Sequence, residues 1–198
     1  TDNNGETSWQ GGGLAIHSQT TANIVNTIFH DNTPNSIHDG TPGSGFDINY
    51  SLTEEYWNER MNVNLRHYFF TVQSVKKEMI KNKGGAIVNI GSASWMVGQG
   101  GMAAYTAAKS GVVGLTRSFA RDLGEHNIRV NSVVPGWTMT ERQIQKWLTP
   151  ESEKELMKNQ CLKSKLMPSD IAKAVLFFSS DQSSGCTNQS YVVDKGWL

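Results

Sequence analysis

The hydrophobic positions of the chain follow two different periods. Between residues 11 and 33, apolar and polar residues alternate, which is the two-residue period of strands. Beyond Ser51, apolar residues instead recur at three-, four- and seven-residue steps, which is the period of one helical face. The strand-like alternation is carried by Leu14, Ile16, Ile24, Asn26 and Ile28. The pattern therefore predicts two segments of unlike structure.

From Ser51 on, helices and strands are expected to alternate. A capping-box start at 51–54 opens a helix that ends at Lys83-Gly84-Gly85. Its apolar face consists of Trp57, Met61, Leu65, Val72, Val75 and Met79. The other predicted elements are a buried strand over 86–91, a helix over 102–125, a strand over 128–134, a short helix from 149, a helix capped by Ser169 that runs through Phe178, and a strand over 191–193. Helices between buried strands are crossover connections, so the fold class is α/β with a parallel sheet.

The distribution of charged residues indicates a boundary between the two segments. The chain has 18 basic and 18 acidic residues, but none of the basic residues precedes Arg60. Residues 1–46 are rich in Asn, Thr, Ser and Gly, and the turn-rich run around 40–45 ends them. We therefore divide the chain into an atypical β-like segment, 1–46, and a catalytic part, 47–198.

The composition also excludes several classes of protein. A net charge of zero argues against nucleic acid as a partner, and no apolar run is long enough for a membrane-spanning helix. The first residues have neither the basic nor the apolar region of a signal peptide. They also include no initiator Met, which we expect of a piece of a longer chain. Cys161 and Cys186 are too few for a disulfide scaffold, which favours reduced thiols in the cytoplasm.

The N-terminal segment resembles one coil of a right-handed parallel β-helix, as found in bacterial surface adhesins. The residues behind this resemblance are Gly12-Gly13-Leu14 and Phe29-His30-Asp31-Asn32. A solenoid coil buries its apolar face only against neighbouring coils, so one coil is not a domain. No Cys or carboxylate stands at ligand spacing around His17, His30 and His38, which predicts solvated histidines and no metal site.

Candidate chemistry lies at the carboxyl ends of the predicted strands, where α/β sheets bind their ligands. Ser92 follows the first strand, and 135–140 follows the second. Tyr105 and Lys109, four residues apart, share one face of a helix. A phenol has a pKa of about 10, and a cation one helical turn away lowers it toward the range of a general base.

These residue types together can oxidise an alcohol. Tyr105 would take the hydroxyl proton while Ser92 holds the substrate oxygen, and the hydride requires a nicotinamide cofactor because no side chain accepts it. Asn64 could hold water that passes protons from Lys109 to solvent. Each residue also has a plainer interpretation: the Tyr–Lys pair as surface packing, Ser92 as a turn residue, and Asn64 as the cap of a helix kink.

Residues 51–198 resemble the C-terminal part of a short-chain dehydrogenase/reductase. The family's Ser and Tyr-x-x-x-Lys stand here as Ser92 and 105–109, its active-site Asn as Asn64, and its Pro-Gly-x-x-x-Thr stretch as 135–140. The resemblance implies a partial Rossmann-like, doubly wound sheet, NAD or NADP as cofactor, and a homo-oligomer formed through the helices of Asn64 and Tyr105. The implied cofactor contacts are Tyr105, Lys109, Pro135, Gly136, Thr138 and Thr140.

Within the family, the chain is most similar to sugar 1-dehydrogenases that act on D-xylose or other aldoses. Runs such as Gly91-Ser92-Ala93-Ser94-Trp95 and Gln160-Cys161-Leu162-Lys163 carry this likeness. Flat apolar and amide side chains can grip a sugar ring, so Trp95, Trp137 and Gln160 are candidate substrate contacts beside Ser92. The alternative is that the tryptophans are core or interface residues. We expect both cysteines to be buried or half-buried, with Cys161 near the substrate pocket.

The chain departs from the family pattern in its first half. The Gly-rich turn that binds the cofactor diphosphate, the residue that selects NAD or NADP, and the Asn-Asn-Ala-Gly strand have no counterpart here. We therefore expect an unpaired sheet edge and weak or absent NAD(P) binding. Near the end, the family's Asp-Gly-Gly stands as Asp194-Lys195-Gly196, and Lys195 should matter little if it is exposed.

Three functional hypotheses follow from these observations. The first is a nicotinamide-dependent aldose dehydrogenase acting on a small-molecule substrate. The second is a truncated or chimeric remnant of such an enzyme without cofactor binding or turnover. The third is a fragment of a surface adhesin, in which the N-terminal coil is the functional part and further coils would have to precede it.

Overall fold

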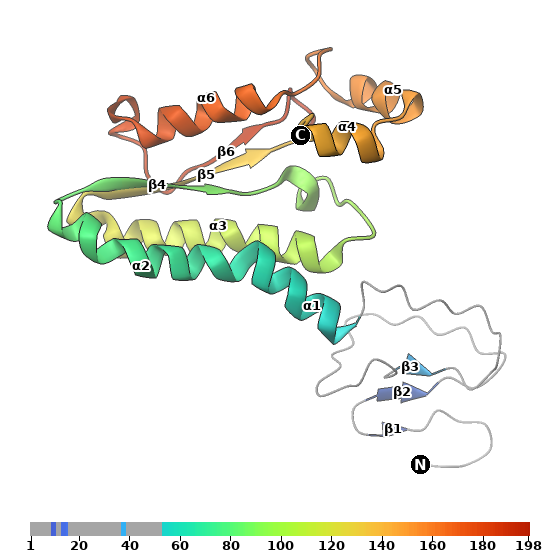
Figure 1. Cartoon of the computed structure of the whole chain (residues 1–198), viewed down its shortest axis with the longest axis horizontal. Coiled ribbons are helices and arrows are strands. Elements are labelled where there is room, and N and C mark those ends of the chain that lie inside the picture. The colour runs from blue at the N-terminus through green and yellow to red at the C-terminus, as the bar shows by residue number, and fades with distance from the viewer. Residues whose placement is uncertain (1–8, 11–12, 16–36, 39–52) are drawn as a thin grey trace. The chain divides into compact units, whose positions relative to one another are not determined.

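A computed structural model describes residues 9–10, 13–15, 37–38 and 53–198. The chain forms two compact units, Thr1–Glu59 and Arg60–Leu198. We describe each unit by itself (Figure 1). The boundary expected after residue 46 remains a prediction.

The first unit contains a small sheet of three short strands, β1 (Trp9–Gln10), β2 (Gly13–Ala15) and β3 (Ile37–His38). β1 pairs with β2 in antiparallel fashion, and β2 pairs with β3 in parallel. The strand predicted around Leu14 is therefore present. The second stretch of alternation, the Phe29–Asn32 run, His17 and His30 lie outside the described residues, so the β-helix resemblance stays a prediction.

The second unit is built on three parallel strands in the order β4-β5-β6. They are β4 (Gly85–Ile90), β5 (Ile128–Pro135) and β6 (Ser190–Val193). Gly85 lies opposite Ile128, and Ser132 lies opposite Ser190. The sheet confirms the predicted α/β class. Among the described residues β4 is an edge strand, as the missing family strands led us to expect.

The first long helix is interrupted by a π-helical turn. It begins as α1 (Glu54–Met61), passes through the turn Asn62–Arg66 and continues as α2 (His67–Lys81). At its start the Thr53 hydroxyl accepts a hydrogen bond of 3.2 Å from the N–H of Tyr56. Ser51, the expected cap, lies outside the described residues.

The remaining helices are α3 (Ala103–Leu123), α4 (Glu141–Trp147), α5 (Pro150–Asn159) and α6 (Pro168–Ser179). The short α4 was not predicted. The expected cap of α6 was also wrong: Met167 takes the N-cap position, and its N–H donates to the Asp170 carboxylate at 3.1 Å. Pro168 fits the first helical position because its missing N–H has no helical partner there, and this places Ser169 inside the first turn.

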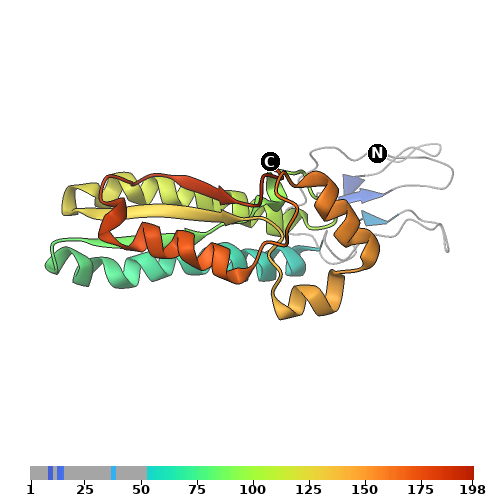
Figure 2. The ribbon, with the colours of Figure 1, turned by 90° about the horizontal axis from the view of Figure 1, so that it is seen from above.

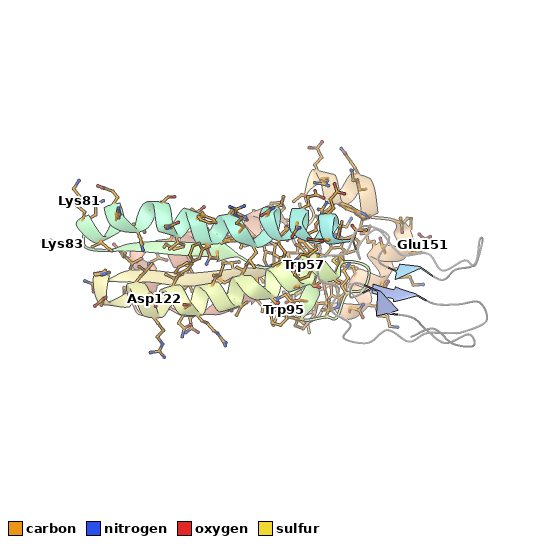
Figure 3. The ribbon with its side chains drawn as sticks, turned by 90° about the horizontal axis from the view of Figure 1, so that it is seen from below. Trp57, Lys81, Lys83, Trp95, Asp122 and Glu151 are labelled. Atoms are coloured by element: carbon orange, nitrogen blue, oxygen red, sulfur yellow. The ribbon has the colours of Figure 1, made fainter. Side chains whose placement is uncertain are left out.

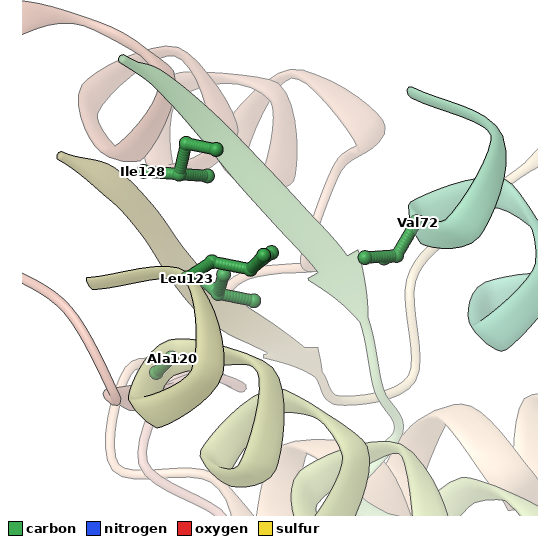
Figure 4. Close-up of a cluster of buried hydrophobic side chains, with 5 residues drawn as sticks. Val72, Ala120, Leu123 and Ile128 are labelled. Atoms are coloured by element: carbon green, nitrogen blue, oxygen red, sulfur yellow. The ribbon is translucent and has the colours of Figure 1, made fainter. Parts of the chain in front are cut away.

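Helices cover both faces of the sheet, α2 and α3 on one face and α6 on the other (Figures 1 and 2). The arrangement is the three-layer, doubly wound one that the resemblance implied. The main apolar cluster lies between the sheet and the pair α2 and α3 (Figure 4). It consists of Val72, Ala120, Leu123, Ile128 and Val130. No helix within the described residues is both long and apolar enough to cross a membrane.

Candidate active site

The three parallel strands end on a common rim. Ser92 follows β4, Gly136 follows β5, and Asp194 follows β6. Trp95 therefore lies at the opposite end of the unit from Lys81 and Lys83, which precede β4 (Figure 3). The rim that the sequence predicted for ligand binding is thus formed by the expected segments.

Ser92 lies half-buried at the end of β4 and caps the short 3-10 turn Ala93–Trp95. Its oxygen accepts a hydrogen bond of 3.2 Å from the N–H of Ser94, and the two serine hydroxyls share a hydrogen bond of 2.9 Å. The interpretation of Ser92 as a turn residue is therefore correct. The same contacts fix the position of its hydroxyl on the rim.

Tyr105 and Lys109 lie on one face of α3, as their spacing predicted. The Lys109 ammonium is 5.9 Å from the centre of the Tyr105 ring, and Lys109 is only 9% exposed. It donates hydrogen bonds of 3.1 Å to the Tyr68 phenol oxygen and to the carbonyl of Ile90. Burial lowers the pKa of Lys109 because it disfavours the charged form.

Tyr68 is the residue that the sequence reasoning missed. Its phenol donates a hydrogen bond of 2.7 Å to the Ile90 carbonyl, so Tyr68, Lys109 and Ile90 form a closed triangle. Burial raises the pKa of Tyr68, and the negative charge of an ionised Tyr105 raises it further. The available signal was its position four residues after Asn64, on the same helical face.

Asn64 lies in the π-helical turn and bonds within its own helix. Its side-chain amide donates a hydrogen bond of 2.9 Å to the carbonyl of Arg60. This contact is what a residue that caps a helix irregularity makes. α3 comes close to the turn here, since a Cβ on Gly111 would lie 3.1 Å from a methyl group of Leu65.

The segment after β5 is held by its own hydrogen bonds. The Thr138 hydroxyl donates to the Gly136 carbonyl at 3.2 Å, and the Thr140 hydroxyl caps α4 by accepting from the N–H of Gln143 at 3.3 Å. The Trp137 indole N–H donates to the side chain of Gln143 at 2.7 Å. Pro135 ends β5, so the predicted cofactor contacts within 135–140 follow this strand on the rim.

Two of the three predicted sugar contacts have unused polar atoms. Gln160 is 1% exposed, and neither atom of its amide has a hydrogen-bond partner among the described residues. The same is true of the indole N–H of Trp95. A buried polar group without a partner is costly in a folded protein, so these atoms would gain from a hydrogen bond to a bound molecule. Trp137 differs because its indole N–H is already bonded.

One expectation about side-chain exposure was wrong. Cys161 is exposed, and its backbone N–H bonds to the carbonyl of Gly196, whereas Cys186 is half-buried as expected. Lys195 does not meet the condition of exposure under which it was expected to matter little. Its side chain is 19% exposed, and its ammonium lies 3.3 Å from the Asp170 carboxylate.

The described residues can hold one end of a nicotinamide cofactor. Tyr105 and Lys109 on α3 and the segment 135–140 after β5 would be the contacts of its nicotinamide end. The family's Thr-Gly-x-x-x-Gly-x-Gly turn, which follows its first strand and binds the cofactor diphosphate, has no counterpart among the described residues. A phenol, a buried cation and a fixed hydroxyl thus lie at the carboxyl ends of a doubly wound sheet, which is where α/β folds place their binding sites.

Comparisons with known proteins name the family. The sequence profile described as "Enoyl-(Acyl carrier protein) reductase" matches residues 46–198. The chain is 48% identical over 146 residues to D-xylose 1-dehydrogenase of Caulobacter vibrioides, covering 74% of this chain and 58% of that enzyme. It is 44% identical over 146 residues to a probable galactose dehydrogenase of Rhizobium meliloti, covering 74% and 57%. The chain therefore belongs to the short-chain dehydrogenase/reductase family.

Solved structures agree with this assignment. A 4-hydroxyisoleucine dehydrogenase complexed with NADH superposes with a TM-score of 0.67 at 33% identity, covering 74% of this chain and 61% of that one. A 7α-hydroxysteroid dehydrogenase complexed with NADH gives 0.70 at 32% identity, covering 74% and 57%. This chain spans a little under three fifths of the curated relatives it matches.

Proposed function

We propose that this chain carries the catalytic part of an NAD(P)-dependent sugar 1-dehydrogenase. The observation that carries the proposal is the placement of Lys109 beside Tyr105 on the rim. The nearly 50% identity to D-xylose 1-dehydrogenase supports an aldose as the substrate. The NADH bound in two similar structures supports the cofactor.

In the proposed reaction, Tyr105 is the general base. Its phenolate takes the proton of the anomeric hydroxyl, and the Lys109 cation favours the phenolate form. The nicotinamide, when bound, supplies the acceptor for the hydride that leaves the same carbon. Ser92 holds the sugar oxygen beside the phenol, and Asn64 serves in the proton path from Lys109 to solvent.

The unused polar atoms support two side chains as sugar contacts. The Gln160 amide can both donate to and accept from sugar hydroxyls, and the Trp95 indole N–H can donate to one. Trp137 offers only its ring face because its N–H is engaged. We therefore rank Gln160 and Trp95 above Trp137 as determinants of sugar binding.

The partners we propose are a small sugar and further copies of the chain, not nucleic acid or a membrane. Phe69 and Phe70 on α2 are 44% and 45% exposed, and an apolar helix surface of this kind supports association through α2 and α3. Cys161 and Cys186 are unpaired thiols, which supports a reducing compartment such as the cytoplasm.

The competing hypothesis is a remnant of the family without turnover. It is favoured by the sheet, which has only three strands in the described part of this unit and presents β4 as an edge. Both hypotheses predict that the chain by itself binds NADH and NADPH weakly. They differ in whether it reacts when the cofactor is in large excess.

The test is a titration of the 198-residue chain with NADH and NADPH, followed by nicotinamide fluorescence, and then an aldose panel with NAD+ or NADP+ in large excess as the hydride acceptor. We expect no saturation in the micromolar range, and slow D-xylose oxidation that Tyr105→Phe abolishes. Tyr191→Phe, which removes a phenol 55% exposed on β6, is the matched control. A folded chain that shows no turnover at any cofactor concentration would support the remnant.

A further inference from the structure

The Lys109 ammonium is held by two oxygens that lie outside its own helix. It donates one hydrogen bond of 3.1 Å to the Tyr68 phenol oxygen, which α2 supplies, and one of 3.1 Å to the Ile90 carbonyl at the end of β4. Lys109 is only 9% exposed, and a buried ammonium needs hydrogen-bond acceptors in place of water. These two contacts therefore fix where the charge of Lys109 lies.

The Tyr68 phenol is itself fixed, and it is fixed in its protonated form. Its O–H donates to the same Ile90 carbonyl at 2.7 Å, and a carbonyl has no proton to give in return. The oxygen that accepts from Lys109 is therefore that of a neutral phenol. The pKa of Tyr68, which burial raises, agrees with this. Tyr68 thus satisfies the ammonium of Lys109 without neutralising its charge.

The second phenol near Lys109 differs in its hydrogen bonding. The Tyr105 ring centre lies 5.9 Å from the ammonium, and the Tyr105 hydroxyl makes no hydrogen bond within the described part of the chain. Of the two tyrosines, Tyr68 is bonded to the lysine and to the strand, whereas Tyr105 keeps its hydroxyl for another partner.

No other side chain of the described residues bonds to the Lys109 ammonium. Asn64, one helical turn before Tyr68, donates its amide to the Arg60 carbonyl. Neither β4 nor the turn Ala93–Trp95 carries a titratable side chain, and no ion pair of the described part of the chain involves Lys109. The other titratable side chains on the neighbouring elements are exposed or bonded elsewhere: Arg66, His67 and Arg129.

We propose that Tyr68 is the positioning residue of Lys109: its phenol, anchored on the Ile90 carbonyl, keeps the lysine charged and beside Tyr105. Without that oxygen the ammonium keeps a single acceptor, and a buried charge with too few hydrogen bonds is unfavourable. Lys109 then gives up its proton more readily, and the positive charge beside Tyr105 is lost. The consequence for turnover rests on the proposed function, whereas the effect on Lys109 does not.

The effect on Lys109 is tested by NMR on the free 198-residue chain, labelled with 13C at the ε-carbon of lysine and titrated with pH. Lys109→Met assigns the signal, and Tyr68→Phe removes the oxygen but keeps the ring. We expect the titration midpoint of Lys109 to fall by about one pH unit in Tyr68→Phe, which is a tenfold easier loss of the proton. Tyr191→Phe, which removes an exposed phenol on β6, should leave it unchanged. A midpoint that stays or rises in Tyr68→Phe would overturn the proposal.

The same contact can be tested from the lysine side, in case Tyr68→Phe does not fold. The chain is labelled with 13C at the ζ-carbon of tyrosine, and wild type is compared with Lys109→Met. The Tyr68 signal should shift when the ammonium is removed, because its oxygen loses a charged donor. An unchanged Tyr68 signal would contradict the contact.

The role in the reaction is tested by measuring kcat for D-xylose, with NAD+ in large excess, from about pH 6 to 10. We expect Tyr68→Phe to lose about tenfold at pH ~7 and to approach the wild type as the pH rises, because a higher pH ionises Tyr105 even where the charge of Lys109 is missing. A loss by the same factor at every pH, or no loss, would overturn the positioning role.

The two sets of measurements separate this proposal from the proposed function. If no aldose is oxidised but the Lys109 midpoint falls in Tyr68→Phe, the proposed function fails and the positioning of Lys109 stands. If the wild type oxidises D-xylose and the midpoint does not fall, the reverse holds.

Discussion

Gly136 lies directly against Asp194. A Cβ atom on Gly136 would fall 2.6 Å from the Cβ and 2.9 Å from the Cα of Asp194. The Asp194 carboxylate is itself fixed, because it accepts hydrogen bonds from the N–H groups of Gly196 at 2.8 Å and Leu198 at 2.9 Å. The ends of β5 and β6 therefore touch backbone to backbone on the rim where the candidate site lies.

Replacing Gly136 with alanine should destabilise the protein. The new methyl group meets backbone, which cannot turn aside as a flexible side chain could, so we expect a loss of about 1–3 kcal/mol in the free energy of unfolding. Urea unfolding measures it. Gly114→Ala on α3 is the control, since its Cβ would meet nothing within 4 Å, and it should stabilise by about 0.5–1 kcal/mol. Equal effects of the two substitutions would contradict the close contact.

Replacing Gln160 with leucine should stabilise the free protein. The substitution removes a buried amide that has no partner among the described residues, and such a group costs about 1–3 kcal/mol. A rise in the urea midpoint with an unchanged slope would show this gain. A stable variant that has lost sugar binding would identify Gln160 as a binding residue, and a destabilised variant would mean that its amide is satisfied in the folded chain.

The stability should depend on pH through Tyr68. Burial raises its folded-state pKa above the ordinary value of about 10, so its contribution is present below pH ~10 and is lost as the pH rises through the folded-state value. The stability difference between the wild type and Tyr68→Phe should therefore shrink above pH ~10. Lys109, whose pKa is lowered by burial, acts in the opposite sense but is present in both proteins.

The measurement is urea unfolding of both proteins at several pH values from about 8 to 11. Tyr191→Phe controls for the loss of an exposed phenol. If the free energies of unfolding of wild type and Tyr68→Phe differ by the same amount at every pH in this range, the pKa of Tyr68 is the same in the folded and unfolded chain.

Lys195 occupies a backbone conformation that favours glycine, with φ at +64°. Lys195→Gly relieves strain of about 1–2 kcal/mol and loses an ion pair of at most about 1 kcal/mol, so we expect a change of less than about 1 kcal/mol. Lys195→Ala keeps the strain and loses the pair, so it should be the least stable of the three proteins. A thermal unfolding series orders them, and an alanine variant as stable as the glycine variant would refute the strain.

Local patterns predicted the fold because they act within a few residues. The apolar steps from Trp57 to Met79 marked the long helix, and buried runs marked β4 and β5. α4 was missed because its seven residues carry only Ile144 and Trp147 as large apolar side chains. Ser169 was chosen as a cap by residue type, whereas Pro168 at the first helical position makes Met167 the cap, two residues earlier.

The site was predictable where its residues are close in sequence. Tyr105 and Lys109 share a helical face by spacing alone. Tyr68 stands 41 residues from Lys109, and its phenol meets the ammonium only because α2 and α3 pack on the same face of the sheet. The sequence could not predict that the Gln160 amide lacks hydrogen-bond partners, because residue type does not determine which hydrogen bonds form in the folded chain.

The π-helical turn Asn62–Arg66 has a consequence for changes in chain length. Such a turn is an α-helix with one residue inserted, and each residue of an α-helix advances by about 100°. Deleting one residue of the turn would therefore restore a regular helix and keep α1 and α2 in phase. A deletion within the regular part of α2 would instead rotate the residues on one side of it by about 100° relative to those on the other. The helix should thus tolerate the loss of one residue at 62–66 better than a loss between His67 and Lys81.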